Sequence, residues 1–348
     1  MFKTLRPTAV PLLQVLLVCG QLVFSALAAA APKAKPPLDV LFLAESRLVV
    51  GSLVEKNPAG RLVFKREKVY GQSTDVPELI DVRAEPALLD STRIGTRYVI
   101  GYSLFHRDKR DPSGYAENRK GAILINTSGL QPALFEDSRL IHKILSKSED
   151  WEGRHSAAMK RLLMKALEGP EPALQLLAAA QFVYAPVLSR QLASADRRMF
   201  EQRARDATAN PALRELMLIG AIERPSEFGE WAGSAISELL ASTPSGGYPP
   251  GTADLTSLVL LAFDETLLHR YPVPFTSLTR WLHSPQRVFV ERSTALLGVL
   301  YPTRQANALE EALGDSSLTG DTRKYIDDQL RIIRGPDSGI DTQQQGPG

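Results

Sequence analysis

Five histidines are the residues best suited to bind a metal or to move a proton near neutral pH. Zinc sites on a helix use two imidazoles four residues apart, so that both side chains extend from the same helix face. The sequence contains no such pair among His106, His142, His155, His269 and His283. We therefore expect neither a metal nor a cofactor in this chain.

Two short motifs contain catalytic residues in other proteins, but both lack their partners here. His106-Arg107-Asp108 is the catalytic tripeptide of protein kinases, in which the aspartate accepts the proton of the substrate hydroxyl. The glycine-rich loop, strand lysine and Asp-Phe-Gly motif of kinases do not accompany it. Gly314-Asp315-Ser316 is similar to the nucleophile block of one esterase family, but no histidine follows Ser316 to act as its base. Both motifs favour polar turns, and we expect no catalytic residues.

The N-terminus has the pattern of a bacterial secretory leader. The basic residues Lys3 and Arg6 precede the apolar stretch Leu12–Ala31, which ends in a run of alanines. Small residues stand where signal peptidase needs them for cleavage near Ala28–Ala31. This pattern predicts a signal peptide over residues 1–30 and an exported protein, periplasmic or secreted, whose mature form has no membrane span. An uncleaved membrane anchor is the alternative.

The single cysteine, Cys19, lies inside this leader. Lipid attachment is disfavoured, because such sites need a small residue immediately before the cysteine and Val18 is not small. After cleavage the chain has no thiol, which excludes disulfides, thiolate catalysis and cysteine-bound metal. Residues 31–38 are rich in proline, lysine and alanine, so we expect them to form an extended linker.

The formal charge of the chain is +2, and loss of the two basic leader residues brings it close to zero. Such a surface has no long-range field to attract phosphates, so nucleic acids and acidic membranes are poor candidate partners. A small basic cluster consists of Arg107, Lys109 and Arg110 beside Tyr115. A solvated loop is the simpler interpretation, and a contact site for an acidic partner is the alternative.

Residues 39–146 carry the alternating apolar pattern of β-strands. Five segments have it, at residues 47–54, 61–70, 78–82, 96–105 and 121–125. Turn-forming residues join the first two segments into a long hairpin. Because closure leaves no unpaired edge, five short strands favour a small closed barrel.

Three short segments of this region carry a family resemblance: Val49-Val50-Gly51-Ser52-Leu53-Val54, Glu67-Lys68-Val69-Tyr70-Gly71 and Ile94-Gly95-Thr96-Arg97-Tyr98-Val99-Ile100. They resemble the strands of the netrin-like, tissue-inhibitor-of-metalloproteinase-like version of the oligonucleotide/oligosaccharide-binding (OB) barrel. The resemblance implies a fold only. Inhibitors of that family bind the zinc of the protease through an N-terminal cysteine, which the mature chain lacks.

From residue 154 to residue 334 the apolar residues recur at three- and four-residue steps, which predicts a series of short helices. Each helix is too short to be stable alone, so neighbours must cover its apolar face. The starts of the outer-type helices are spaced as in helical repeats, near Pro211, Thr252, Pro285 and Asp321. This part resembles HEAT or armadillo repeats. Residues 335–348 are expected to be a disordered tail.

The expected fold class is therefore multidomain, with a small N-terminal all-β OB-like barrel and a C-terminal all-α HEAT-like solenoid. Solenoids present extended binding surfaces, so we expect a non-enzymatic scaffold that binds another protein or a peptide. One alternative is a cell-envelope hydrolase or transferase whose carboxylates come together from distant helices. The other is a protease inhibitor that uses the barrel rim.

Overall fold

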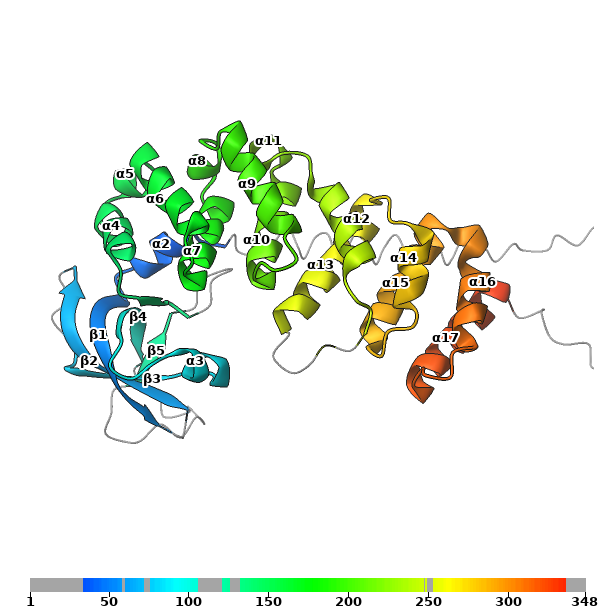
Figure 1. Ribbon diagram of the computed structural model, residues 1–348, viewed down its shortest axis with the longest axis horizontal. Helices are drawn as coiled ribbons and strands as arrows, with labels where there is room; N and C mark the ends of the chain where they lie inside the picture. Colours follow the sequence, from blue (N-terminus) through cyan, green and yellow to red (C-terminus); the bar gives the residue numbers. More distant parts are fainter. Residues whose placement is uncertain are drawn as a thin grey trace, which may run out of the picture. The chain divides into compact units, whose positions relative to one another are not determined.

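The computed structural model describes residues 34–57, 60–71, 76–105, 121–125, 132–246, 248 and 253–335. A small, mainly antiparallel sheet forms the N-terminal region, and a largely helical part follows it, as the sequence predicts (Figure 1). The expected signal peptide over residues 1–30 and the expected tail beyond Gly335 lie outside the described residues.

The sheet has six strands in the order β1-β2-β3-β5-β4-β6, and β1 also pairs with β4. The bounds are β1 Ser46–Asn57, β2 Arg61–Tyr70, β3 Leu79–Arg83, β4 Arg97–Phe105, β5 Gly121–Leu124 and β6 Leu134–Glu136. The pairs are antiparallel except for β3 with β5, which is parallel. The pairing thus runs from β1 through β2, β3, β5 and β4 back to β1. The strand β6, only three residues long, was not expected from the sequence.

Two glycines allow close approach of the backbone in this sheet. A Cβ at Gly51 would lie 3.0 Å from the carbonyl oxygen of Lys65, beside a register shift in the β1–β2 ladder. A Cβ at Gly101 would lie 2.8 Å from Leu41 Cδ2 and 2.9 Å from Ala133 Cβ. Both positions require glycine, because any larger residue would push the neighbouring atoms away.

Sixteen helices are described, and most of them begin at a proline or a capping side chain. Their bounds are α2 Pro37–Leu41, α3 Pro86–Ser91, α4 Arg139–Lys147, α5 Trp151–Arg154, α6 Ala157–Glu168, α7 Pro172–Tyr184, α8 Pro186–Ser189, α9 Ser194–Arg205, α10 Pro211–Glu223, α11 Pro225–Phe228, α12 Ala232–Ser242, α13 Ala253–His269, α14 Phe275–Trp281, α15 Arg287–Leu300, α16 Pro302–Leu313 and α17 Gly320–Arg334. At α10, for example, the side chain of Asn210 accepts a hydrogen bond from Ala212 N at 2.8 Å and Pro211 follows it, as the sequence predicts.

The helices pack mainly against neighbours in sequence. One row is formed by α7, α10, α13 and α15, each in contact with the next, while α9, α12, α14 and α16 pack beside members of this row. Aromatic side chains fill the spaces between them, and Trp281 meets Phe263 and Phe289 edge to face at 5.4 and 5.1 Å. Trp281 has no exposed surface and lies in the centre of this packing.

Some side chains of the sheet belong to the core of the helical part, whereas the others form a second hydrophobic cluster within the sheet. Leu38 and Leu41 of α2 are buried in the same cluster as Phe135 of β6 and the buried side of α7. The backbone N–H of Leu38 donates to Gln181 Oε1 at 3.0 Å across this core. The linker expected over residues 31–38 is therefore wrong at its end, because Pro37 and Leu38 belong to a buried helix. The sequence did not reveal this burial, because the prolines around these residues are typical of an extended linker.

None of the helices in the described ranges combines the length and the apolar character needed to cross a membrane.

Candidate functional site

The contact residues expected from the sequence, Arg107, Lys109, Arg110 and Tyr115, lie outside the described residues. His106, the first residue of the kinase-like tripeptide, lies outside them too. Two other sites come from the described part of the chain: a polar cluster between the sheet and α4, and an exposed surface along the helices α10, α13 and α15.

The polar cluster is a hydrogen-bonded chain of three residues from separate elements. The hydroxyl of Tyr70, at the end of β2, meets Nδ1 of His142 on α4. The other ring nitrogen of His142, Nε2, meets a carboxylate oxygen of Asp137, which lies just after β6. Asp137 and His142 are only five residues apart, but the sequence offers no sign that Tyr70 joins them.

The direction of these hydrogen bonds follows from the acidity of the partners. A carboxylate only accepts, so Nε2 of His142 carries a proton and donates it to Asp137. Burial and then the charge of Asp137 raise the pKa of Tyr70 to about 12, so its hydroxyl keeps its proton and donates to Nδ1. This arrangement fixes one tautomer of the imidazole. An ion pair also reaches Asp137, from Arg97 Nη2 of β4 at 3.3 Å.

Arg97 extends this network across the sheet. Its Nε lies 2.8 Å from Glu67 Oε2 on β2, and the hydroxyl of Ser52 on β1 donates to the same glutamate. Three strands are thereby linked to the start of the helical part. A fixed Tyr–His–Asp chain has the parts for proton transfer, but here both ring nitrogens of His142 are engaged by residues of the fold, which favours a positioning role.

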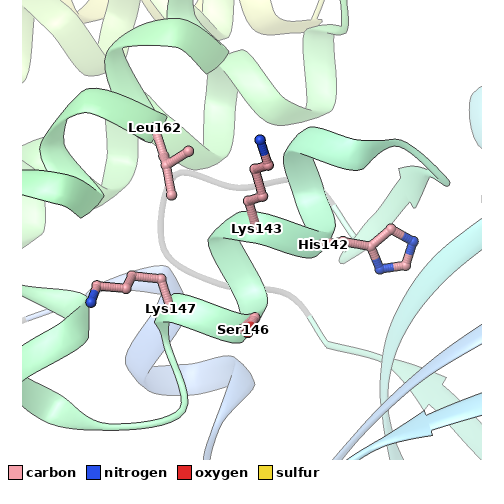
Figure 2. A pocket seen from close by; sticks show the side chains of 5 residues that line it. All are labelled: His142, Lys143, Ser146, Lys147 and Leu162. Carbon is pink, nitrogen blue, oxygen red and sulfur yellow. The ribbon is translucent and has the colours of Figure 1, made fainter.

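A shallow depression of about 400 Å³ lies beside this chain, between α4 and α6 (Figure 2). It is lined by His142, Lys143, Ser146, Lys147 and Leu162. The ring of His142 extends away from the two lysine side chains in Figure 2, and its nitrogens are already engaged by Tyr70 and Asp137. The depression therefore offers two lysine side chains to a ligand, but no imidazole nitrogen that is free to react.

Near the contact between the sheet and the first helices, the carboxyl group with the most strongly shifted pKa is that of Glu171, at the start of α7. Burial raises its pKa to about 7, the N–H of Glu136 opposes this, and the charge of Glu136 adds to the rise. That N–H donates to Glu171 Oε1 at 2.9 Å. A carboxyl that titrates near neutrality is suited to general acid chemistry, but neither Glu171 nor Glu136 lines the depression in Figure 2.

The second candidate site is the exposed surface that three helices share. Side-chain pairs tie these helices together: Ser257 of α13 donates to Glu215 of α10 at 3.0 Å, and Arg292 of α15 lies 2.7 Å from Asp264 of α13. Residues three, four, seven and eight positions from these pairs share their helix face. We call the resulting surface the α10–α15 face; it consists of Glu215, Ile219, Ile222, Glu223, Ser257, Leu261, Asp264, Leu268, Arg292, Ala295 and Val299.

The α10–α15 face exposes large apolar side chains. Leu268 is 72% exposed and Val299 is 42% exposed, while Ile219, Ile222 and Leu261 are half-buried against the core. On an amphipathic surface helix these positions are ordinarily polar. Their succession over three neighbouring helices makes the face a candidate for protein contact.

Several carboxyl groups lie on this face or beside it. The pKa of Glu215 is raised by burial and then by the charge of Asp254, and that of Glu265 is raised by burial and, in part, by Asp264 and Glu223. Burial also raises the pKa of Asp264, with Arg292 acting in the opposite direction. Among the basic groups, Arg292 pairs with Asp264, Arg224 interacts with Glu223, and the imidazole of His269 lies 3.2 Å from Glu265. Carboxyl groups therefore outnumber cations at this face.

The remaining residues of interest from the sequence are separated in the fold. His155 packs against Trp151 with ring centroids 4.3 Å apart and the two rings tilted. His283 lies 2.7 Å from Asp315, the aspartate of the esterase-like block, and hydrogen bonds from Ser317 and His283 lower the pKa of Asp315 to about 2. Such a carboxylate accepts hydrogen bonds within its own turn. In the described part of the chain, no group of three or more histidine, cysteine, aspartate or glutamate residues is placed to hold a metal ion.

No protein family model, curated protein or solved structure matches this chain.

Proposed function

We propose that this chain is an exported, non-enzymatic scaffold that binds a protein or peptide segment through the α10–α15 face. In this proposal the N-terminal region is an OB-like barrel of the netrin type, and the helices form a HEAT-like solenoid. The pairing of strands from β1 back to β1 supports the barrel, and the row of helices α7, α10, α13 and α15 supports the solenoid. The leader pattern supports export.

The observation that carries the binding function is the exposure of Leu268 and Val299 on a face that neighbouring helices share. Covering these two side chains removes apolar surface from water, which is the main driving force of protein association. In the polar cluster at Tyr70, in contrast, the hydrogen-bonding groups already pair with one another.

Affinity capture tests this function with the mature protein as bait and a periplasmic extract as the source of partners. The test variant carries Leu268→Asn and Val299→Ser, and the matched control carries Ile94→Asn, which changes a 61% exposed apolar residue in the sheet region. We expect the wild type and the control to retain the same partner and the test variant to lose it. Equal capture by all three proteins, or none by any, contradicts the proposal.

The raised pKa of Glu171 favours a second candidate, hydrolysis of an envelope polymer with carboxyl groups of the junction. A hydrolase of this kind would release soluble products from such a polymer and would lose that activity in Glu171→Gln. The scaffold proposal expects no release by the wild type, and unchanged partner capture by Glu171→Gln and by His142→Gln.

A further inference from the structure

We propose that the occupant of the α10–α15 face is a cationic amphipathic helix of another protein, with its apolar side on Leu268 and Val299 and its lysines or arginines against the surrounding carboxylates. This inference rests on the proposed function and adds the chemistry of the partner to it.

The charge of the face determines the sign of the partner. Glu215, Glu223, Asp254, Asp264 and Glu265 interact with one another electrostatically or share neighbours, and Arg292 already pairs with Asp264. An incoming ammonium or guanidinium group relieves the repulsion between these carboxylates, whereas an incoming carboxylate adds to it. Charge complementarity therefore favours a segment that carries lysine or arginine beside its apolar residues.

The same charges argue against two other occupants. An acidic bilayer would be repelled by the carboxylates that flank the apolar side chains. A second copy of this chain, bound through the same face in a two-fold contact, would bring one acidic face against another. A partner of opposite charge is free of both costs.

The backbone of the face determines the conformation of the partner. The helices α10, α13 and α15 satisfy their own hydrogen bonds, so the face presents no strand edge to which an extended peptide could pair. A helical segment brings its backbone hydrogen bonds with it. Neighbouring packed helices lie about 8–10 Å apart, so crossing from α10 to α15 takes roughly 11–13 helical residues.

Binding of two labelled peptides of about 14 residues tests the inference. One repeats leucine and lysine at helical spacing, and the other replaces every lysine with glutamate. We measure fluorescence anisotropy with the full mature chain at low and at high salt. The expected result is that the lysine peptide binds, more weakly at high salt, and that the glutamate peptide does not.

Variants of the face locate the binding. Leu268→Asn with Val299→Ser should weaken binding of the lysine peptide about tenfold or more, because the apolar contact is lost. Glu215→Gln with Glu223→Gln should weaken it about fivefold at low salt, because two attractions are lost. The control, Glu149→Gln with Glu168→Gln, removes the same number of charges from exposed glutamates elsewhere and should leave the affinity unchanged.

Each other outcome overturns the inference in a recognisable way. Equal or tighter binding of the glutamate peptide at this face refutes the charge assignment while the scaffold function stands. Binding of anionic phosphatidylglycerol vesicles, or a dimer in sedimentation experiments, that disappears in Leu268→Asn assigns the face to a lipid surface or a second copy. Failure of both peptides, together with equal partner capture by wild type and variant, overturns the scaffold function as well.

Discussion

The sheet and the helical part of this protein are held together over different distances along the chain. In the sheet, β1 pairs with β2 across a short turn but also with β4, so that Leu48 lies opposite both Tyr70 and Gly101. In the helical part, each element packs mainly against the next few helices. Disruption of one strand therefore affects the whole sheet, whereas disruption of one helix should remain local.

A matched pair of core truncations gives the largest expected effect and tests this contrast directly. Phe64 of β2 and Phe289 of α15 both have no exposed surface, so either change to alanine should cost about 3–5 kcal/mol. We expect Phe64→Ala to lower the hydrogen-exchange protection of all strands. Phe289→Ala should lower it in α13 to α17 and leave α6 and α7 protected. If Phe289→Ala lowered the hydrogen-exchange protection of all helices, the helical part would be as cooperative as the sheet and the contrast between the two regions would not hold.

The hydrogen bond between Leu38 N and Gln181 sharpens the comparison, because it links the two regions. Gln181→Leu leaves the buried N–H of Leu38 without its acceptor, which should cost about 2 kcal/mol in urea unfolding. The loosening should appear first in the amide exchange of α2. The control Gln305→Leu removes a donor to Thr294 O in the distal helices and should leave α2 unchanged. Unaltered exchange of α2 in Gln181→Leu would mean that other contacts hold this helix.

The smallest effect concerns the pH dependence of stability at Glu171. Its pKa in the folded chain, about 7, lies above the ordinary 4.5, so the folded state binds the proton more tightly. The resulting stabilisation is complete below pH 4.5 and is lost as the pH rises through 7. Glu171→Gln should therefore match the wild type at low pH and exceed it by about 1 kcal/mol at pH 8, a figure reduced for solvent screening.

Urea unfolding at pH 4.5 and pH 8 measures this difference. The control is Glu168→Gln, an exposed glutamate at the end of α6, which should not change the pH dependence. The prediction is wrong if the free energy of unfolding of the wild type rises, relative to that of Glu171→Gln, between the lower and the higher pH.

The two regions also differ in what their sequences reveal. Apolar residues at helical spacing predicted starts near Pro211, Thr252, Pro285 and Asp321, close to the starts of α10, α13, α15 and α17, because these signals are local. The short elements α2 and β6 escaped prediction, since they are stabilised by distant parts of the chain.

The candidate sites were hidden for the same reason. Nothing near Tyr70 indicates that β2 ends beside His142, and no local pattern shows that Glu215 lies against Ser257. The α10–α15 face is also hard to distinguish from a core stripe, because Leu261 and Leu268 continue the apolar pattern of α13. Only the packing of the helices decides which leucine meets water.

The bond between Leu38 and Gln181 spans 143 residues, and this separation has a consequence for synthesis. At roughly 5–20 residues per second, a ribosome needs on the order of ten seconds after making the first partner before the second emerges. During that interval α2 has no docking partner in α7, so Leu38 and Leu41 cannot be buried against it. The docking of α2 is therefore a late step of folding, which must wait for the synthesis of α7.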